Sequence, residues 1–285
     1  MAEDQESSFK WFLLISFSIS WTSFFSGVLY GILGKIIARD VLFIFGTIGP
    51  IIAFLSLMAT YKNKDYNKDF WRRIYYPKIG PKWLILGTVL LPILLNLSLV
   101  LFSLIGTGPT LVFGNLLSKN GLFLLFSLIG ILGWYGYAFP LIHKKISNKL
   151  QEWKKQFTIK PFKNMEKLTS IFAGLIIGVL WSLWQVPIVF IFESYPESLG
   201  VSSFGFWEYF LLIPIQSVTI SWVFSKTENS TFTVIIFFLA EITRFFFEIS
   251  LTFQIIRFVL WILIAGFFVF NEWGLNLIPF LEKDK

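Results

Sequence analysis

Residues 168–192 read L-T-S-I-F-A-G-L-I-I-G-V-L-W-S-L-W-Q-V-P-I-V-F-I-F and contain no charged residue. A helix needs about 20 apolar residues to cross the hydrocarbon core of a bilayer. Similar apolar runs recur along the chain, without the ten-residue alternating segments of membrane β-barrels. Backbone groups in a bilayer are then satisfied within each helix. The sequence therefore predicts an all-α fold, a polytopic bundle of transmembrane helices.

We expect about eight transmembrane helices in a single integral membrane domain, residues 1–285. The chain is 55% apolar and only 14% charged, a composition far from that of a soluble domain. The first apolar run lacks the small-residue cleavage site of a signal peptide, so we expect it to be retained as a span. The predicted spans are residues 10–33, 41–61, 83–106, 121–142, 168–192, 206–225, 231–251 and 255–276.

Lysine and arginine are concentrated in alternate loops. If the N-terminus is cytoplasmic, 19 of the 24 Lys and Arg residues lie on the cytoplasmic side and three lie outside. Cytoplasmic loops carry such an excess of positive charge, so both termini are predicted to be cytoplasmic. This topology explains the net charge of +7 without a nucleic-acid partner. The predicted partner is the lipid bilayer, and a composition rich in Ile, Phe, Lys and Asn favours a multi-pass protein of a bacterial cytoplasmic membrane.

The basic loop from Lys144 to Lys167 carries a second membrane signal. Its large apolar residues fall on one helical face, and most of its lysines lie on other faces. This pattern is typical of a helix that lies in the head-group layer, although an ordinary basic loop is the open alternative. The apolar residues of this face are Ile146, Leu150, Trp153 and Phe157.

Two motifs inside the spans are unusual. Gly130 to Pro140 reads G-I-L-G-W-Y-G-Y-A-F-P, and Trp181 to Pro187 reads W-S-L-W-Q-V-P. Glycines spaced three or four residues apart allow helices to approach closely, and the pair Gly174 and Gly178 has this spacing too. The polar Gln185 is costly in an apolar helix unless it finds a hydrogen-bond partner. The motifs indicate either tight packing or a functional site.

These motifs resemble the CPBP family of intramembrane proteins, the CAAX-protease and bacteriocin-processing type. I-S-W at 19–21, F-G-T-I-G-P at 45–50 and F-W-R-R-I…K-I-G-P-K-W at 70–83 precede them in the family's order. The most similar core is residues 121–251. The resemblance implies the fold of a membrane-embedded metallo- or glutamate-dependent protease.

The resemblance also implies that the catalytic residues are missing. The family's first motif reads E-E-L-G-W-R-G-Y, and this chain keeps the G-W-x-G-Y frame with other residues at the glutamate and arginine positions. The second motif, W-x-x-W-H-x-P, keeps its frame without its histidine, and the later histidine position is apolar. We therefore expect no catalytic residue and no metal, with zinc only if the protein is active. The family's catalytic positions fall on Gly130, Ile131, Tyr135, Gln185 and Phe238.

The chain has one histidine, His143, and no cysteine. Zinc is held in proteins by His, Cys, Asp and Glu side chains, so the supply of ligands is poor. His143 is predicted at the cytoplasmic edge, away from the motif positions. We interpret it as a solvated or structural residue and not as part of the site.

The seventh predicted span carries three charges, Glu241, Arg244 and Glu248, on one helical face. Arg257 of the last span is a possible fourth member of this group. Charged residues inside a bilayer are expensive and are often functional. Together with Gln185 they form either a buried ion network or a polar ligand-binding cavity.

Three functions fit these observations. The leading hypothesis is a non-catalytic pseudoprotease that binds a peptide, a lipid or a membrane partner, with a role in bacteriocin immunity or regulation suggested by family analogy. The first alternative is an active intramembrane endopeptidase in which Glu241 or Glu248 replaces the missing carboxylates. The second alternative is a transporter-like solute binder.

Overall fold

The computed structural model describes residues 2–60, 64–75, 79–87, 128–156, 168–189, 204–241 and 251–272. Every regular element within these ranges is a helix, which confirms the all-α prediction. The elements are α1 (Ala2–Ile32), α2 (Ile36–Thr47), α3 (Gly49–Thr60), α4 (Lys64–Tyr75), α5 (Pro81–Ile85), the π-helix η3 (Leu132–Ala138), α9 (Phe139–Gln156), α10 (Thr169–Val189), α11 (Phe204–Thr227), α12 (Ser230–Glu241) and α14 (Leu251–Phe270).

Three described helices are long and apolar enough to cross a bilayer. They are α1 over Ser7–Ile32, α10 over Thr169–Pro187 and α14 over Leu251–Phe270. The pair α2 and α3, bent by 49°, can form a fourth span. The described residues thus support a membrane protein with three or four crossing helices but do not support the predicted number of eight. Much of the predicted spans 83–106, 121–142 and 231–251 lies outside the described residues.

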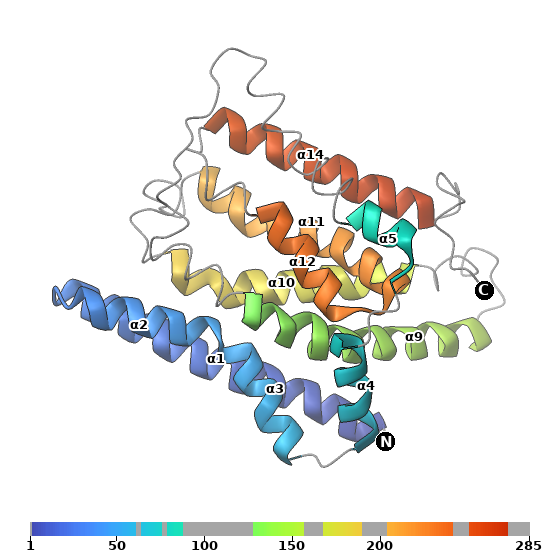
Figure 1. Ribbon diagram of the computed structural model, residues 1–285, viewed down its shortest axis with the longest axis horizontal. Helices are drawn as coiled ribbons and strands as arrows, with labels where there is room; N and C mark the ends of the chain where they lie inside the picture. Colours follow the sequence, from blue (N-terminus) through green and yellow to red (C-terminus); the bar gives the residue numbers. More distant parts are fainter. Residues whose placement is uncertain are drawn as a thin grey trace.

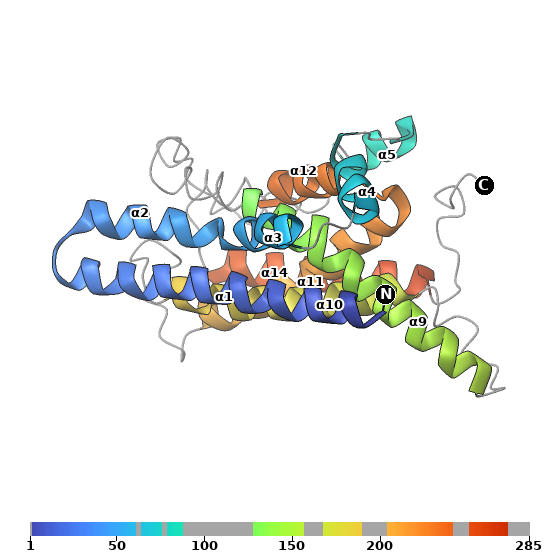
Figure 2. The ribbon, with the colours of Figure 1, turned by 90° about the horizontal axis from the view of Figure 1, so that it is seen from below.

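The described helices form two layers. Figures 1 and 2 show α1, α10, α11 and α14 side by side in one layer, with α2, α3, α12 and α4 over one face of it. The hairpin of α1 and α2 forms one edge, and α14 forms the other. The segment from η3 into α9 crosses between the two layers, so it contacts both.

The closest helix pair in the first layer is α10 and α11. Gly178 lies so near α11 that a Cβ on it would be 2.5 Å from the Cα of Pro214, and Gly174 is equally tight against Ser221. The Ser182 hydroxyl donates to the carbonyl oxygen of Phe210 across this contact at 2.9 Å. Small residues let helices in a bilayer approach and gain van der Waals contact. The predicted packing role of Gly174 and Gly178 is therefore confirmed.

The bend between α2 and α3 has a local cause. Gly49 and Pro50 open α3, and proline has no N–H group with which to continue the preceding helix. Gly49 also lies directly against Ser20 of α1. The predicted span 41–61 is consequently two short helices joined at an elbow, and this elbow packs on η3.

The turn between α11 and α12 comprises Glu228 and Asn229. Asn229 caps α12, since its side-chain oxygen accepts a hydrogen bond from the backbone N–H of Phe232 at 2.6 Å. Glu228 has a φ of 51°, in the left-handed region. Its N–H donates to the carbonyl oxygen of Phe224 at 2.7 Å, which ends α11 in the geometry that glycine usually adopts after a helix.

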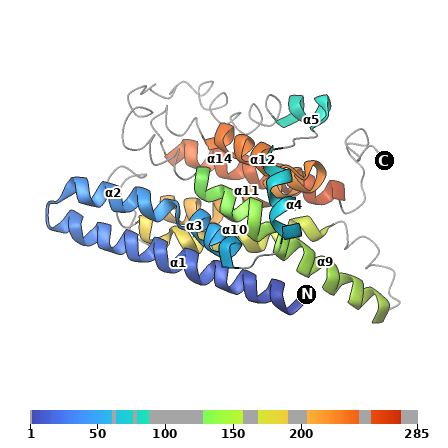
Figure 3. The same ribbon diagram turned by 60° about the horizontal axis from the view of Figure 1, so that its bottom comes forward.

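Helix α9 continues from η3 and extends away from the bundle (Figure 3). The predicted helical conformation of the loop from Lys144 to Lys167 is confirmed from Lys144 to Gln156, in a helix that begins at Phe139; Phe157 lies outside the described residues. Leu150 is buried, and Ile146 packs against the main core. Trp153, in contrast, is 48% exposed. Part of the predicted lipid-facing side therefore packs on the protein itself.

Candidate functional site

The glycine-rich motif forms the π-helix η3, Leu132–Ala138. The N–H of Phe139 donates to the carbonyl oxygen of Trp134, five residues earlier. Single π-turns within helices occur often at functional sites. In η3 the wide turn directs the side chains of Trp134 and Tyr135 into the bundle, where both are fully buried.

The glycines of this motif lie under the elbow of α2 and α3. A Cβ on Gly133 would be 2.6 Å from the carbonyl oxygen of Pro50, and one on Gly130 would collide with the carbonyl oxygen of Thr47. A Cβ on Gly136 would be 2.7 Å from the ring of Phe70 in α4. At Gly130 and Gly133 backbone atoms occupy the space that a side chain would need.

Tyr135, at the arginine position of the family motif, packs into an aromatic wall. Its ring lies 6.2 Å from that of Trp181 and 5.8 Å from that of Phe139, measured between ring centroids. Its hydroxyl faces Ser217 and Ser221 of α11. None of these three hydroxyls makes a hydrogen bond of good geometry within the described part of the chain. Buried hydroxyls without partners are costly, so the tight packing here must offset that cost.

The second motif lies next to the first. Trp184 is 6.4 Å from Trp134 between ring centroids, and its carbonyl oxygen accepts a hydrogen bond of 3.2 Å from the indole N–H of Trp21 in α1. Gln185 is 9% exposed and so is buried. The structure therefore brings the two motifs together through aromatic contacts between η3 and α10.

The third position, Phe238, lies half-buried in α12. Its neighbour Phe237 packs on Trp181 with 4.9 Å between ring centroids. Glu241 is the last residue of α12. Arg244 and Glu248 lie outside the described residues, as do the contacts of the Glu241 side chain. Of the four predicted members of the ion group, the structure therefore describes only Glu241, without its side-chain contacts, and Arg257.

Arg257 has a partner that the sequence analysis did not predict. Its guanidinium donates to a carboxylate oxygen of Glu208 in α11 at 2.7 Å, and both side chains are buried. Glu208 is recognisable in the sequence as an acidic residue inside an apolar run. The sequence does not show that it pairs with Arg257, because 49 positions separate the two residues. This pair connects α11 to α14 between the motif helices and the edge of the bundle.

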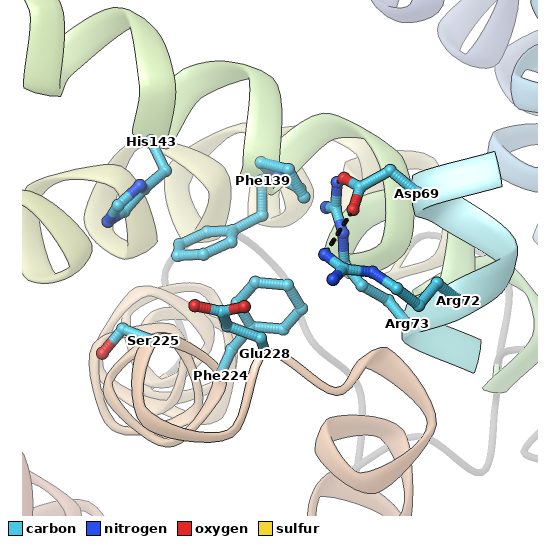
Figure 4. Close-up of a pocket in the computed structure, with 9 residues that line it drawn as sticks. Asp69, Arg72, Arg73, Phe139, His143, Phe224, Ser225 and Glu228 are labelled. Atoms are coloured by element: carbon cyan, nitrogen blue, oxygen red, sulfur yellow. Dashed lines mark hydrogen bonds and ion pairs between the residues drawn. The ribbon is translucent and has the colours of Figure 1, made fainter. Parts of the chain in front are cut away.

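A cavity of about 220 Å³ lies beside η3, where α4, α9 and α11 meet. Its lining includes His143, which stacks at an angle on Phe139 with 5.7 Å between ring centroids. Figure 4 shows His143 on one side and the charged residues of α4 on the other, with Glu228 between them. The sequence analysis interpreted His143 as a solvated or structural residue and did not predict that it lines a pocket. The other residues lining it are Asp69, Arg72, Arg73, Phe139, Pro140, Phe224, Ser225 and Glu228.

Burial lowers the pKa of His143 from its ordinary value of 6.5, and the charge of Glu228 acts in the opposite direction. Below about pH 6.5 the imidazole of His143 is therefore protonated more readily in the unfolded chain than in the folded chain. Stability should be complete above about pH 6.5 and fall as the pH decreases below it. We expect the melting temperature to drop more between about pH 7 and pH 5.5 for the native protein than for His143→Gln. Parallel pH profiles would contradict this assignment.

The described residues contain no group of three or more His, Asp or Glu side chains that could hold a metal ion. Of the carboxylates inside the predicted spans, Glu208 is paired with Arg257, and the side chain of Glu241 lies outside the described set. The absence of a metal from the site therefore stays a prediction. It depends in part on Glu248, which is not described.

Comparison with protein-family profiles gives no match. A search of characterised proteins finds similarity to CAAX prenyl protease 2 of Methanococcus maripaludis, 27% identical over 209 residues. The match covers 67% of this chain and 66% of the relative, just under two thirds of the relative's length. Together with the ordered motifs, this similarity supports a CPBP, or CAAX-protease-like, assignment for the chain.

Proposed function

We propose that this protein is a non-catalytic member of its family, a pseudoprotease of a bacterial cytoplasmic membrane. In this proposal it crosses the bilayer about eight times, with both termini in the cytoplasm. It binds a peptide, a lipid or a partner membrane protein. A role in bacteriocin immunity or in regulation is consistent with the family but depends on analogy of fold.

The observation that carries the proposal is the packing at the family's first glutamate position. Gly130 lies directly against the Thr47 carbonyl, so a glutamate there would collide with the backbone of the α2–α3 elbow. Ile131, at the second glutamate position, is 1% exposed in the main core. The surroundings of both positions are thus adapted to residues that cannot activate water.

The remaining motif residues support the same conclusion chemically. Peptide hydrolysis needs a base to activate water and a metal or cation to stabilise developing charge. Tyr135 is neutral and enclosed by aromatic rings. The amide of Gln185 cannot take a proton at neutral pH as an imidazole can. These positions can pack and form hydrogen bonds, but they do not supply a base or a strong metal ligand.

The direct test is metal analysis of the purified protein combined with an assay for cleavage of peptide substrates, including prenylated ones. We expect less than one zinc ion per ten molecules and no cleavage above that of a mock purification. The active alternative, with relocated carboxylates, predicts cleavage that Glu241→Gln or Glu248→Gln abolishes. Stoichiometric zinc, or cleavage lost in either variant, would refute the pseudoprotease proposal.

A further inference from the structure

The pocket beside His143 carries charges of both signs. Helix α4 supplies one wall with Arg72, Arg73 and Asp69, and the turn after α11 supplies Glu228 (Figure 4). Aromatic rings lie between these walls; those of Phe139 and Phe224 are 5.0 Å apart between centroids. None of the family's catalytic positions lines this pocket.

The α4 wall has an excess of positive charge. Asp69 accepts hydrogen bonds from both Arg72, at 2.7 Å, and Arg73. Partial burial acts to raise the pKa of Asp69, but the hydrogen bonds and charges of Arg73 and Arg72 outweigh it and lower that pKa. Two guanidinium groups thus face one carboxylate, and each has five N–H donors. The free donors of Arg72, whose side chain is 63% exposed, suit a phosphate.

The turn after α11 contributes the carboxylate of Glu228 to the pocket, at a position where the backbone conformation favours glycine. Glu228 has a φ of 51°, a left-handed backbone conformation that is unfavourable for a residue other than glycine. Glycine would end α11 without that cost. Such strain is concentrated at functional sites, and the glutamate here points its carboxylate into the pocket (Figure 4). Its presence indicates that the negative charge is used.

The pocket lies at the depth where spans end. Helix α11 ends at Thr227 and His143 follows the predicted span 121–142 directly. The loops at this end contain most of the lysines and arginines, which places it on the predicted cytoplasmic side. At 220 Å³ the cavity is smaller than the roughly 300–1,000 Å³ of drug-sized sites. A lipid head group has the required size and depth.

We propose that this pocket binds the phosphoethanolamine head group of a membrane phospholipid. The phosphate lies against Arg72 and Arg73, and the ammonium group donates hydrogen bonds to Glu228. A choline group lacks the N–H donors that Glu228 requires, and a glycerol head group lacks the positive charge. This inference specifies a ligand for the binding role proposed above, and it does not depend on the absence of proteolysis.

The test measures lipid binding by native mass spectrometry and thermal stabilisation of the purified full-length chain in detergent. Phosphatidylethanolamine, phosphatidylcholine and phosphatidylglycerol with identical acyl chains are compared with water-soluble glycerophosphoethanolamine. We expect phosphatidylethanolamine to bind about tenfold more tightly than the other lipids, a difference of about 1.4 kcal/mol. Tighter binding of phosphatidylglycerol would refute the zwitterionic site. Equal affinity for glycerophosphoethanolamine, or displacement by a zwitterionic dipeptide, would refute the lipid assignment.

Variants separate binding from folding. Glu228→Gln should abolish the preference for ethanolamine over choline, and Arg72→Gln should weaken binding of all three phospholipids. Glu228→Gly should be at least as stable as the native chain, because it relieves the left-handed strain, and should still lose the preference. Arg39→Gln is the matched control, since Arg39 also pairs with a neighbouring aspartate, Asp40, at the far end of the molecule. An unchanged preference in Glu228→Gln and Glu228→Gly would overturn the proposal.

Discussion

Gly133→Ala is expected to destabilise the protein by about 1–3 kcal/mol, the usual cost of overpacking a tight core. The added Cβ would lie 2.6 Å from the carbonyl carbon and oxygen of Pro50. These are backbone atoms of the α2–α3 elbow, so they cannot move aside as a flexible side chain can. Gly133→Leu should prevent recovery of folded protein. The measurement is thermal unfolding in detergent, followed by tryptophan fluorescence.

Gly266→Ala is the control for this prediction. A Cβ on Gly266 of α14 would meet no atom of the described residues within 4 Å, and alanine is about 1 kcal/mol better than glycine in a helix interior. This variant should be as stable as the native protein or slightly more stable. The packing account is wrong if both alanine variants unfold at the native temperature.

The same reasoning applies to attempts to rebuild an active site. Gly130→Glu places a side chain against the Thr47 carbonyl. Restoring the family's glutamates should therefore lower the yield of folded protein and should not restore peptide cleavage. This result would separate a scaffold adapted to the loss of catalysis from one that merely lacks its catalytic residues.

Arg257→Ala should destabilise the protein by about 3–5 kcal/mol, the range observed when one partner of a buried ion pair is removed. Arg257 is 6% and Glu208 0% exposed as side chains, so the remaining carboxylate would be left buried. The second oxygen of Glu208 already has no hydrogen-bond partner within the described part of the chain. Thermal unfolding and the yield of monodisperse protein report the loss.

A double variant tests whether the cost comes from the unpaired charge. Glu208→Leu with Arg257→Met replaces the pair by apolar groups and should recover most of the lost stability. Arg39→Met breaks a partly exposed pair with Asp40 and should cost less than about 1 kcal/mol. If the double variant is as unstable as Arg257→Ala, the pair does not act through charge compensation.

The sequence predicted the features that depend on local pattern. Long apolar runs predicted α1, α10 and α14, which are long and apolar enough to cross a bilayer. Glycine spacing predicted the close contact of α10 with α11, which Gly174 and Gly178 make. The family frame predicted that the two motifs belong together, and Trp134 and Trp184 are in contact across them.

Features that depend on distant partners were not predictable in the same way. Glu208 and Arg257 are separated by 49 residues, and no periodicity relates positions on different helices. The pocket beside His143 requires α4, about 70 residues earlier in the chain. His143 alone looked like a residue at a membrane edge. The cavity that it lines also contains Glu228 and Arg72, which only the tertiary fold brings to the same place.

Helix α11 illustrates why hydropathy alone does not decide which helices cross the bilayer. This helix has the length to cross a bilayer, but it is not among the described helices that are also sufficiently apolar. It contains buried polar residues, among them Glu208, Gln216 and Ser217. Their neighbours within the bundle shield them from lipid. Helices of this kind cannot be counted from hydropathy alone.

The central claim is that the family's catalytic centre is closed and packed, and the most direct measurement is the accessibility of a cysteine at position 185. The native chain contains no cysteine, so Gln185→Cys introduces a unique thiol at a buried site. We expect no reaction with a charged, water-soluble maleimide until the protein is unfolded, whereas Asn148→Cys on the exposed side of α9 reacts at once. Labelling of Cys at 185 in the folded protein, at a rate near that of the control, would show a water-filled catalytic cavity and contradict the account.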